Sequence, residues 1–328
     1  MSATLTAPPP VPSAQPAAPR RKKPSYDWGD SVFKYVTLAF ALSILAIALG
    51  IAYELFINSS LARHAFGWAF LGKQIWDPVA ENFGALPFIY GTLVSSLLAL
   101  IIAVPLGVGV AIFLAELAPR RVSDACSFLV ELLAAIPSVV YGLIGIFVLV
   151  PFMRVHLQPL LIKLLGWTPL FKGPAYGVGM LTAGIVLAIM IVPFIATISR
   201  EVLLSVPLPL KESAMALGAT HWEVVRLAVL PYARSGIIGS IFLGLGRALG
   251  ETMAVTMVIG NRPEIAASLL APGYTMAAVL ANEFTEATSD LYVHTLIEIG
   301  LVLFMITIVV NGVARLILLR MNADPAGR

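Results

Sequence analysis

Charged side chains are scarce in this 328-residue chain. Asp, Glu, Lys and Arg together make up 12% of it, about half the share found in ordinary globular proteins. A water-soluble fold of this length would have too little charge to cover its apolar surface. The single cysteine, Cys126, excludes an internal disulfide framework and a Cys-based zinc cluster. The four histidines are scattered without partners at ligand spacing, so we expect no metal site.

Apolar residues take the place of the missing charge, at 59% of the chain. A membrane-spanning helix needs about 20 mostly apolar residues, and six segments meet this requirement. The sequence therefore predicts an all-α, polytopic membrane protein with six transmembrane helices. The expected spans are Val36–Ile57, Thr92–Leu117, Ser127–Phe152, Gly177–Ser199, Ile237–Gly260 and Leu291–Leu318. The third contains Pro137, so we expect it to be kinked, broken or partly re-entrant.

Composition also suggests how the chain is organised. Residues 1–30 are rich in Pro and Ala, with a basic cluster at 20–23, and predict a disordered cytoplasmic arm. We expect residues 31–86 to form an uncleaved first transmembrane helix and an outer loop. Residues 87–320 would form the core of the membrane domain, with a cytoplasmic loop at 200–235, and residues 321–328 a cytoplasmic tail.

The distribution of basic residues predicts the orientation. With the N-terminus inside, 14 Lys and Arg residues lie on the cytoplasmic side and 6 on the other, and Arg247 lies within a span. Because short cytoplasmic loops of membrane proteins are enriched in Lys and Arg, both termini should be cytoplasmic. The three outer loops would then be Asn58–Tyr90, Met153–Tyr176 and Asn261–Asp290.

The cytoplasmic loop at 200–235 has the pattern of two helices joined by a glycine. Residues 212–217 are strong helix formers, and Gly218 suits a left-handed helix end. Thr220 and Glu223 have the spacing of a capping box at the start of a second helix, which we expect to stop at Pro231. Such a rigid projection at the membrane surface is suited to being gripped by another protein.

This loop resembles the EAA motif of ABC-importer permeases: Glu212-Ser-Ala-Met-Ala-Leu-Gly218, nine residues, then Ala228-Val-Leu230-Pro231. Ser213 and Ala228 depart mildly from the motif. The resemblance implies that Glu212, Ala214, Gly218, Leu230 and Pro231 engage a separate ATPase. That subunit would use ATP and magnesium, while this chain binds no cofactor. The alternative is an interfacial amphipathic helix that has no partner.

A second resemblance covers the chain from about Phe33 to Arg320. It rests on the strings Phe113–Pro119, Ala135–Gly142, Gly246–Val255 and Ala271–Tyr274, which are similar to those of phosphate-specific ABC-importer permeases, more so to the subunit lettered C. The resemblance implies a type I permease fold in the bacterial inner membrane. It also implies three partners besides lipid: a second homologous permease, an ATPase dimer and an extracytoplasmic phosphate-binding protein. No nucleic acid is expected.

Ionisable residues inside predicted spans are costly and therefore candidate functional groups. Arg247 and Glu251 lie four residues apart in the fifth span, so on one helix they would share a face and could pair. A guanidinium binds phosphate oxygens bidentately, which suits an anion passage; the alternative is a structural ion pair. Glu298 is expected either to face Arg247 or to line an aqueous mouth.

Ser138 and Tyr141 are the remaining passage candidates. Proline leaves a helix carbonyl unpaired, and Pro137 places these two hydroxyl groups close to such a carbonyl. They would either satisfy it or donate hydrogen bonds to a passing oxyanion.

Three other functions fit parts of this pattern. The chain could serve a different oxyanion, such as molybdate, sulfate or phosphonate. It could be an ion-coupled secondary transporter that works alone, or a membrane-embedded signalling subunit. No catalytic string is present, and the near match to a phosphate-binding loop at 67–74 ends in Gln74 rather than Ser or Thr, so we expect no enzyme activity from this chain.

Overall fold

The computed structural model describes residues 28–323, with the backbone alone for 321–323. The residues described are helical, with turns, loops and isolated bridges between the helices. Contacts divide the chain into two units, one ending at Ile51 and one running from Ala52 to Arg328. Of the predicted N-terminal arm only residues 28–30 are described, and they already belong to a helix. The basic cluster at 20–23 lies outside the described residues.

Six helical segments among the described residues are long and apolar enough to cross a membrane, which confirms the predicted number. They are Trp28–Asn58, Leu86–Leu117, Ser138–Leu165, Met180–Leu204, His221–Leu249 and Asp290–Arg320. The first is helix α1 (Trp28–Asn58), none of whose residues is buried. Its apolar, exposed surface suits a lipid environment.

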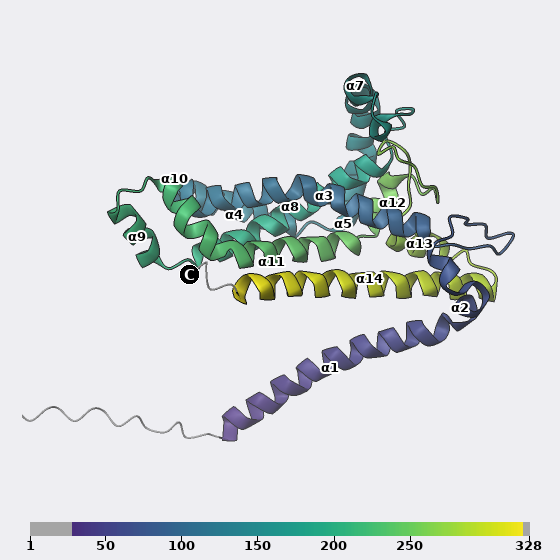
Figure 1. Ribbon diagram of the computed structural model, residues 1–328, viewed down its shortest axis with the longest axis horizontal. Coiled ribbons are helices and arrows are strands. Elements are labelled where there is room, and N and C mark those ends of the chain that lie inside the picture. The colour runs from purple at the N-terminus through teal and green to yellow at the C-terminus, as the bar shows by residue number, and fades with distance from the viewer. Residues whose placement is uncertain (1–27, 324–328) are drawn as a thin grey trace, which may run out of the picture. The chain divides into compact units, whose positions relative to one another are not determined.

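The other spans belong to the second unit. Helix α3 (Leu86–Ile112) continues into the π-helical turn η2 (Phe113–Leu117), and α8 (Met180–Leu204) packs along it. The fifth span consists of α10 (His221–Val224), the π-turn η6 (Val225–Val229) and α11 (Leu230–Leu249), and α14 (Asp290–Ala323) lies beside α11 (Figure 1). The third span runs through α5 (Ser138–Ile144), η3 (Gly145–Leu149), α6 (Val150–Phe152), η4 (Met153–Leu157) and α7 (Gln158–Leu165).

Shorter helices occupy the ends of the bundle. Helix α9 (Leu208–Ala216) and α10 lie at one end of α8 and α11, and α13 (Met276–Glu283) lies towards the other (Figure 1). The remaining elements are α2 (Ser60–Phe66), the 3-10 turns η1 (Gly67–Leu71) and η5 (Pro169–Phe171), α4 (Arg120–Ala134) and α12 (Met253–Ile259).

The predicted third span, Ser127–Phe152, is wrong at its start. Helix α4 ends at Ala134, and a new helix begins after Pro137. The residue before a proline is disfavoured in the helical region, which explains the break. The charged residues Arg120, Arg121, Asp124 and Glu131 make α4 amphipathic, so its apolar residues do not belong to a span. The helix then continues to Leu165, beyond the predicted end.

The predicted fifth span, Ile237–Gly260, is wrong at both ends. Pro231 does not stop the helix, because the π-turn η6 comes directly before α11. A π-turn already shifts the hydrogen-bond ladder, so the missing N–H of a proline at the start of α11 is tolerated. At the other end α11 stops at Leu249, and Gly250 separates it from the short helix α12.

Three clusters of buried side chains hold the second unit together. The central one joins α3, α5, α8 and α12, and α8 is buried over most of its length. A second lies between α2, α3, α13 and α14 and is rich in edge-to-face aromatic pairs such as Trp76–Phe88. Its burial raises the pKa of Tyr274, which keeps that hydroxyl protonated. The third joins α3, α8, α10 and α11 near the loop at 200–235.

Gly91 permits a close approach between α3 and the loop that precedes α13. A Cβ at Gly91 would overlap the backbone carbonyl of Tyr274. One residue on, the hydroxyl of Thr92 accepts a 2.9 Å hydrogen bond from the backbone N–H of Met276. The loop before α13 is therefore fixed against α3 by backbone contact.

We expect Gly91→Ala to destabilise the protein by about 1–3 kcal/mol, since two backbone segments must separate to make room. Thermal unfolding of the purified protein in detergent measures this effect. Gly109→Ala is the matched control, because Gly109 lies in the same helix and a Cβ there meets no atom within 4 Å. Equal stability of the two variants would contradict the close packing at Gly91.

Candidate functional site: a broken helix and a surface loop

The break between α11 and α12 brings several of the predicted passage residues together. Helix α11 ends at Leu249 and α12 begins at Met253. The N–H groups of Gly250 and Glu251 still donate 3.4 Å hydrogen bonds to carbonyls of α11. Backbone groups that a break leaves unpaired are tolerated in a membrane where they line a cavity or lie within protein. Broken helices near mid-membrane are a recurring way to bind ions and anions in transporters.

Arg247 lies in the last turn of α11, and its side chain is exposed. Its guanidinium carbon lies 5.8 Å from the ring centroid of Phe194 on α8. Among the described residues no carboxylate forms a salt bridge with it. A cation at a helix C-terminus is favoured by the exposed carbonyls there. Arg247 thus remains available to an anion in this conformation.

The predicted pairing of Arg247 with Glu251 is wrong. An i, i+4 pair must lie on one continuous helix, and α11 ends two residues before Glu251. The Glu251 carboxylate instead accepts a 3.3 Å hydrogen bond from the backbone N–H of Ala254 in the first turn of α12. It therefore helps to start the second half of the broken helix.

The corner at Pro137 lies next to this break. The Tyr141 hydroxyl donates a 2.6 Å hydrogen bond to the carbonyl of Leu133, the group that would otherwise receive the N–H of residue 137. This confirms the expected repair role for Tyr141. Ser138 is the first residue of α5 and is half-buried. Helix α12 packs against α5, so the two interruptions face one region of the protein.

Glu298 lies elsewhere. It is 6% exposed, and its Oε2 atom has no hydrogen-bond partner among the described residues. A Cβ at Gly246, next to Arg247, would lie 4.0 Å from the side-chain oxygen of Asn311 on α14. Glu298 precedes Asn311 by 13 positions on the same helix, a rise of about 20 Å. The expectation that Glu298 faces Arg247 is therefore wrong.

The loop at 200–235 has the predicted helix–glycine–helix form. Gly218 has φ +89°, and the N–H of Ala219 donates to the carbonyl of Ala214 at 3.2 Å, which closes α9. Thr220 and Glu223 form the predicted capping box at the start of α10. These observations confirm that the loop is a structured projection.

The predicted coupling residues differ in burial. Glu212 and Gly218 are exposed, whereas Ala214 and Leu230 are half-buried against the third cluster. Pro231 is exposed at the start of α11. Glu212, Gly218 and Pro231 are therefore accessible on the surface of the projection.

Comparison with known proteins decides the family. Residues 103–323 match the model of the family described as "Binding-protein-dependent transport system inner membrane component". The chain is 49% identical to the phosphate transport system permease protein PstC of Mesorhizobium japonicum, over 98% of this chain and 99% of that protein. It is 48% identical to PstC of Haemophilus influenzae, over 92% of this chain and 97% of that protein.

This chain belongs to the binding-protein-dependent transport system inner membrane component family. It is therefore a multi-pass inner-membrane permease subunit, a non-catalytic component of an ABC transporter.

Solved structures agree on the fold. A bacterial alginate ABC transporter in complex with an alginate-bound periplasmic protein matches with a TM-score of 0.55 and 16% identity, over 88% of this permease and 96% of that chain. The MetNI methionine transporter in an inward-facing conformation matches with a TM-score of 0.51 and 20% identity, over 73% and 94%. Both are ABC transporters, and the matches support the predicted fold.

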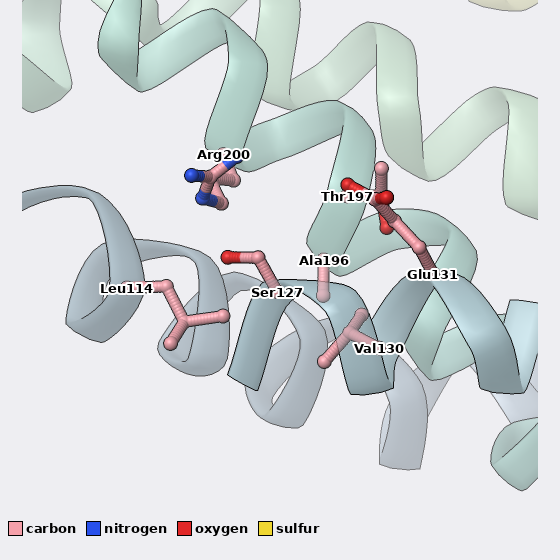
Figure 2. A pocket seen from close by; sticks show the side chains of 7 residues that line it. All are labelled: Leu114, Ser127, Val130, Glu131, Ala196, Thr197 and Arg200. Carbon is pink, nitrogen blue, oxygen red and sulfur yellow. The ribbon is translucent and has the colours of Figure 1, made fainter. Parts of the chain in front are cut away.

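Sequence reasoning missed two features of the permease. Lys211, just before the predicted coupling residues, forms a salt bridge with Glu116. Glu116 belongs to the string Phe113–Pro119, but this pairing was not predicted. A small hollow between α4 and α8 is lined by Arg200, Ser127 and Glu131, among others (Figure 2). Neither contact follows from local spacing, since each joins helices far apart in the sequence.

We expect Tyr141→Phe to cost about 0.5–1.5 kcal/mol of stability, because the Leu133 carbonyl loses its side-chain partner. Thermal unfolding in detergent checks this expectation. Tyr232→Phe is the control, since Tyr232 is exposed on α11. A Tyr141→Phe protein as stable as the control would show that the corner at Pro137 does not need this hydrogen bond.

Proposed function

We propose that this permease is one half of the translocation pathway of an ATP-driven phosphate importer. The observation that carries the proposal is its 49% identity, over nearly its whole length, to a permease named for phosphate transport. A relative from Mycobacterium tuberculosis, phosphate transport system permease protein PstC 2, is 42% identical over 88% of the chain. The chemistry of the broken helix supports the same substrate.

Arg247 is the residue that we propose meets the anion. Its planar guanidinium can donate two parallel hydrogen bonds to phosphate oxygens, and it is exposed without a carboxylate partner among the described residues. Tyr141 and Ser138 lie on α5, and Glu251 lies at the start of α12. In this proposal Glu251 limits the positive charge of the empty site, and the hydroxyl groups shape its wall. The site has to bind weakly, because tight binding would slow release.

Glu298 has a different place in the proposal. On α14, Glu298 lies far from Asn311, the residue of that helix that is near Gly246 and Arg247. Glu298 therefore does not belong to the same anion site, and at 6% exposure it does not lie on an open surface either. Its helix α14 packs against α2 (Ser60–Phe66), the short helix that follows α1. We propose that Glu298 helps to fix α14 near the outer end of the pathway.

The loop at 200–235 is the proposed contact with the ATPase. Glu212 and Gly218 are exposed, and the capping box keeps the two short helices in a fixed relation. Closure of an ATPase dimer would move this projection, rotate the permease halves and expose the passage to each side in turn. The energy for this switch must come from partners that bind the two conformations with different affinity.

The orientation in the membrane and the partner proteins are also part of what we propose. The excess of basic residues on one side, 14 against 6, favours cytoplasmic termini and a cytoplasmic coupling loop. The partners are a second homologous permease, an ATPase dimer that hydrolyses ATP, and an extracytoplasmic phosphate-binding protein on the outer loops. We keep the proposed organisation of a first helix and outer loop at 31–86 and a core at 87–320.

Arg247→Ala is expected to reduce phosphate uptake at least 10-fold, since loss of a bidentate charged contact costs more than about 1.4 kcal/mol. Uptake of labelled phosphate into vesicles that contain the whole importer measures this, with sulfate and molybdate as competitors. Arg247→Lys should recover only part of the rate, because an ammonium lacks the planar fork.

Arg315→Ala, which removes an exposed arginine of α14, is the control and should transport normally. Normal uptake by Arg247→Ala would refute the passage role of this residue. Stronger competition by sulfate or molybdate than by unlabelled phosphate would instead overturn the assignment of the substrate.

Gly218→Val is expected to lower the ATP hydrolysis stimulated by the binding protein several-fold, because φ +89° is strained for a β-branched residue. Gly218→Asn is the matched variant: Asn tolerates positive φ better, and nothing lies within 4 Å of a Cβ there. Its activity should lie closer to that of the wild type. If the binding protein stimulates ATP hydrolysis as strongly in Gly218→Val as in Gly218→Asn, the backbone conformation at Gly218 plays no part in coupling.

A further inference from the structure

The proposed coupling helix α9 is weakly attached to the protein. None of its nine residues is buried, and an isolated helix of this length is unstable in water. It joins α8 through residues 205–207, and the half-buried Ala214 contacts the third cluster. A force applied to α9 therefore needs a firmer connection to reach the transmembrane helices.

Lys211 supplies a direct connection from α9 to a transmembrane segment. Its Nζ atom lies 2.7 Å from Oε1 of Glu116, and the two side chains are 16% and 9% exposed. The other salt bridge among the described residues joins the sequence neighbours Arg200 and Glu201, and the Glu201 side chain is 63% exposed. Removing one partner of a largely buried pair leaves an uncompensated charge, so Lys211 and Glu116 depend on each other.

Glu116 lies in η2, the π-turn at the end of α3, and this turn is tied to α4. The Ser123 hydroxyl of α4 donates a 2.7 Å hydrogen bond to the carbonyl of Leu114 in η2. At its other end α4 reaches the Pro137 corner, where Tyr141 of α5 bonds to Leu133. Direct contacts thus run from α9 through η2 and α4 to α5, beside the broken helix.

The contact between α4 and α8 is incompletely satisfied. The hollow between them is lined by Ser127 and Glu131 of α4 and by Thr197 and Arg200 of α8, and the Ser127 side chain points towards Arg200 (Figure 2). Ser127 Oγ and Arg200 Nε are buried and have no hydrogen-bond partner in the part of the chain that the structure describes. Each unpaired buried group costs about 1–3 kcal/mol, so the packing of α4 on α8 leaves two buried polar groups unsatisfied in this conformation.

We propose that the Lys211–Glu116 ion pair transmits movement of the coupling helix into η2 and α4. Because η2 carries Glu116 and is hydrogen-bonded to α4, a displacement of α9 shifts η2 and α4 and with them the Pro137 corner next to the passage. This inference rests on the proposed function, since it assumes that an ATPase acts on α9. Glu116 and Lys211 are positioning residues: they contact neither substrate nor nucleotide.

The test uses the complete importer in vesicles, with Glu116→Gln and Lys211→Met as single variants. We expect both to remain assembled with the ATPase subunit on purification, at some cost in stability, while phosphate taken up per ATP hydrolysed falls about 10-fold, within the range of effects at coupling positions. Glu116→Lys combined with Lys211→Glu restores the pair in reverse and should recover most of the ratio. Asp124→Asn, an exposed carboxylate of α4, is the control and should match the wild type.

A wild-type ratio in both single variants would overturn the proposal, and so would loss of the ATPase subunit from them, because the pair would then serve docking. Failure of an assembled double variant to recover would also overturn it. Uptake by the wild-type importer in the same vesicles tests the proposed function separately. Stimulation of ATP hydrolysis by the binding protein reports coupling even if the transported anion is not phosphate.

Discussion

The structure depends on one constraint of the membrane: a backbone carbonyl or N–H facing lipid has no water to replace a missing partner. Three places in this permease where a helix is interrupted or carries a proline each have a replacement contact or a shift of the hydrogen-bond ladder. At Pro137 the replacement is the Tyr141 hydroxyl. At Pro231 it is the π-turn η6. At Gly250 the Glu251 carboxylate takes up a backbone N–H at the start of α12.

The same constraint explains where the proposed site lies. A break in a helix places polar backbone groups inside the membrane region, and neighbouring helices must then shield them or leave a polar cavity there. Helices α5 and α12 pack together so that two breaks face one region, with Arg247 at the end of α11. The exposed helix carbonyls stabilise a guanidinium there while no anion is bound. The guanidinium can still exchange those interactions for a phosphate oxygen.

The sequence was sufficient to predict the membrane class, the number of spans and the form of the coupling loop. Long apolar runs, Gly218 and the Thr220–Glu223 spacing are local signals, and each determines structure within a few residues. The predicted span boundaries were wrong where apolar sequence continued past the end of a helix. The apolar residues of α4 resemble a span although they belong to an amphipathic helix, and the apolar α12 resembles a continuation of α11 although Gly250 separates them.

The candidate site was predicted only in part, for the same reason. Arg247 stands out because an arginine in an apolar run is rare, whereas its relation to Glu251 depended on helix continuity that Gly250 removes. The relation of Glu298 to Arg247 depended on the register between α11 and α14, which no local pattern encodes. Lys211 and Glu116 are 95 positions apart, and their pairing depends on tertiary packing that no local pattern encodes.

Binding and coupling place opposite demands on a permease of this kind. The passage needs groups that hold the anion briefly, so its charge should be partly balanced and its donors few. The coupling segment needs contacts that persist while it moves, so a desolvated ion pair is better suited there than an exposed one, which is screened and flexible. In the mechanism that we propose, two different places meet these demands: an exposed arginine at a helix break, and a shielded lysine–glutamate pair at the surface loop. This separation is consistent with the proposal that a partner protein supplies most of the selectivity while the permease converts movement into access.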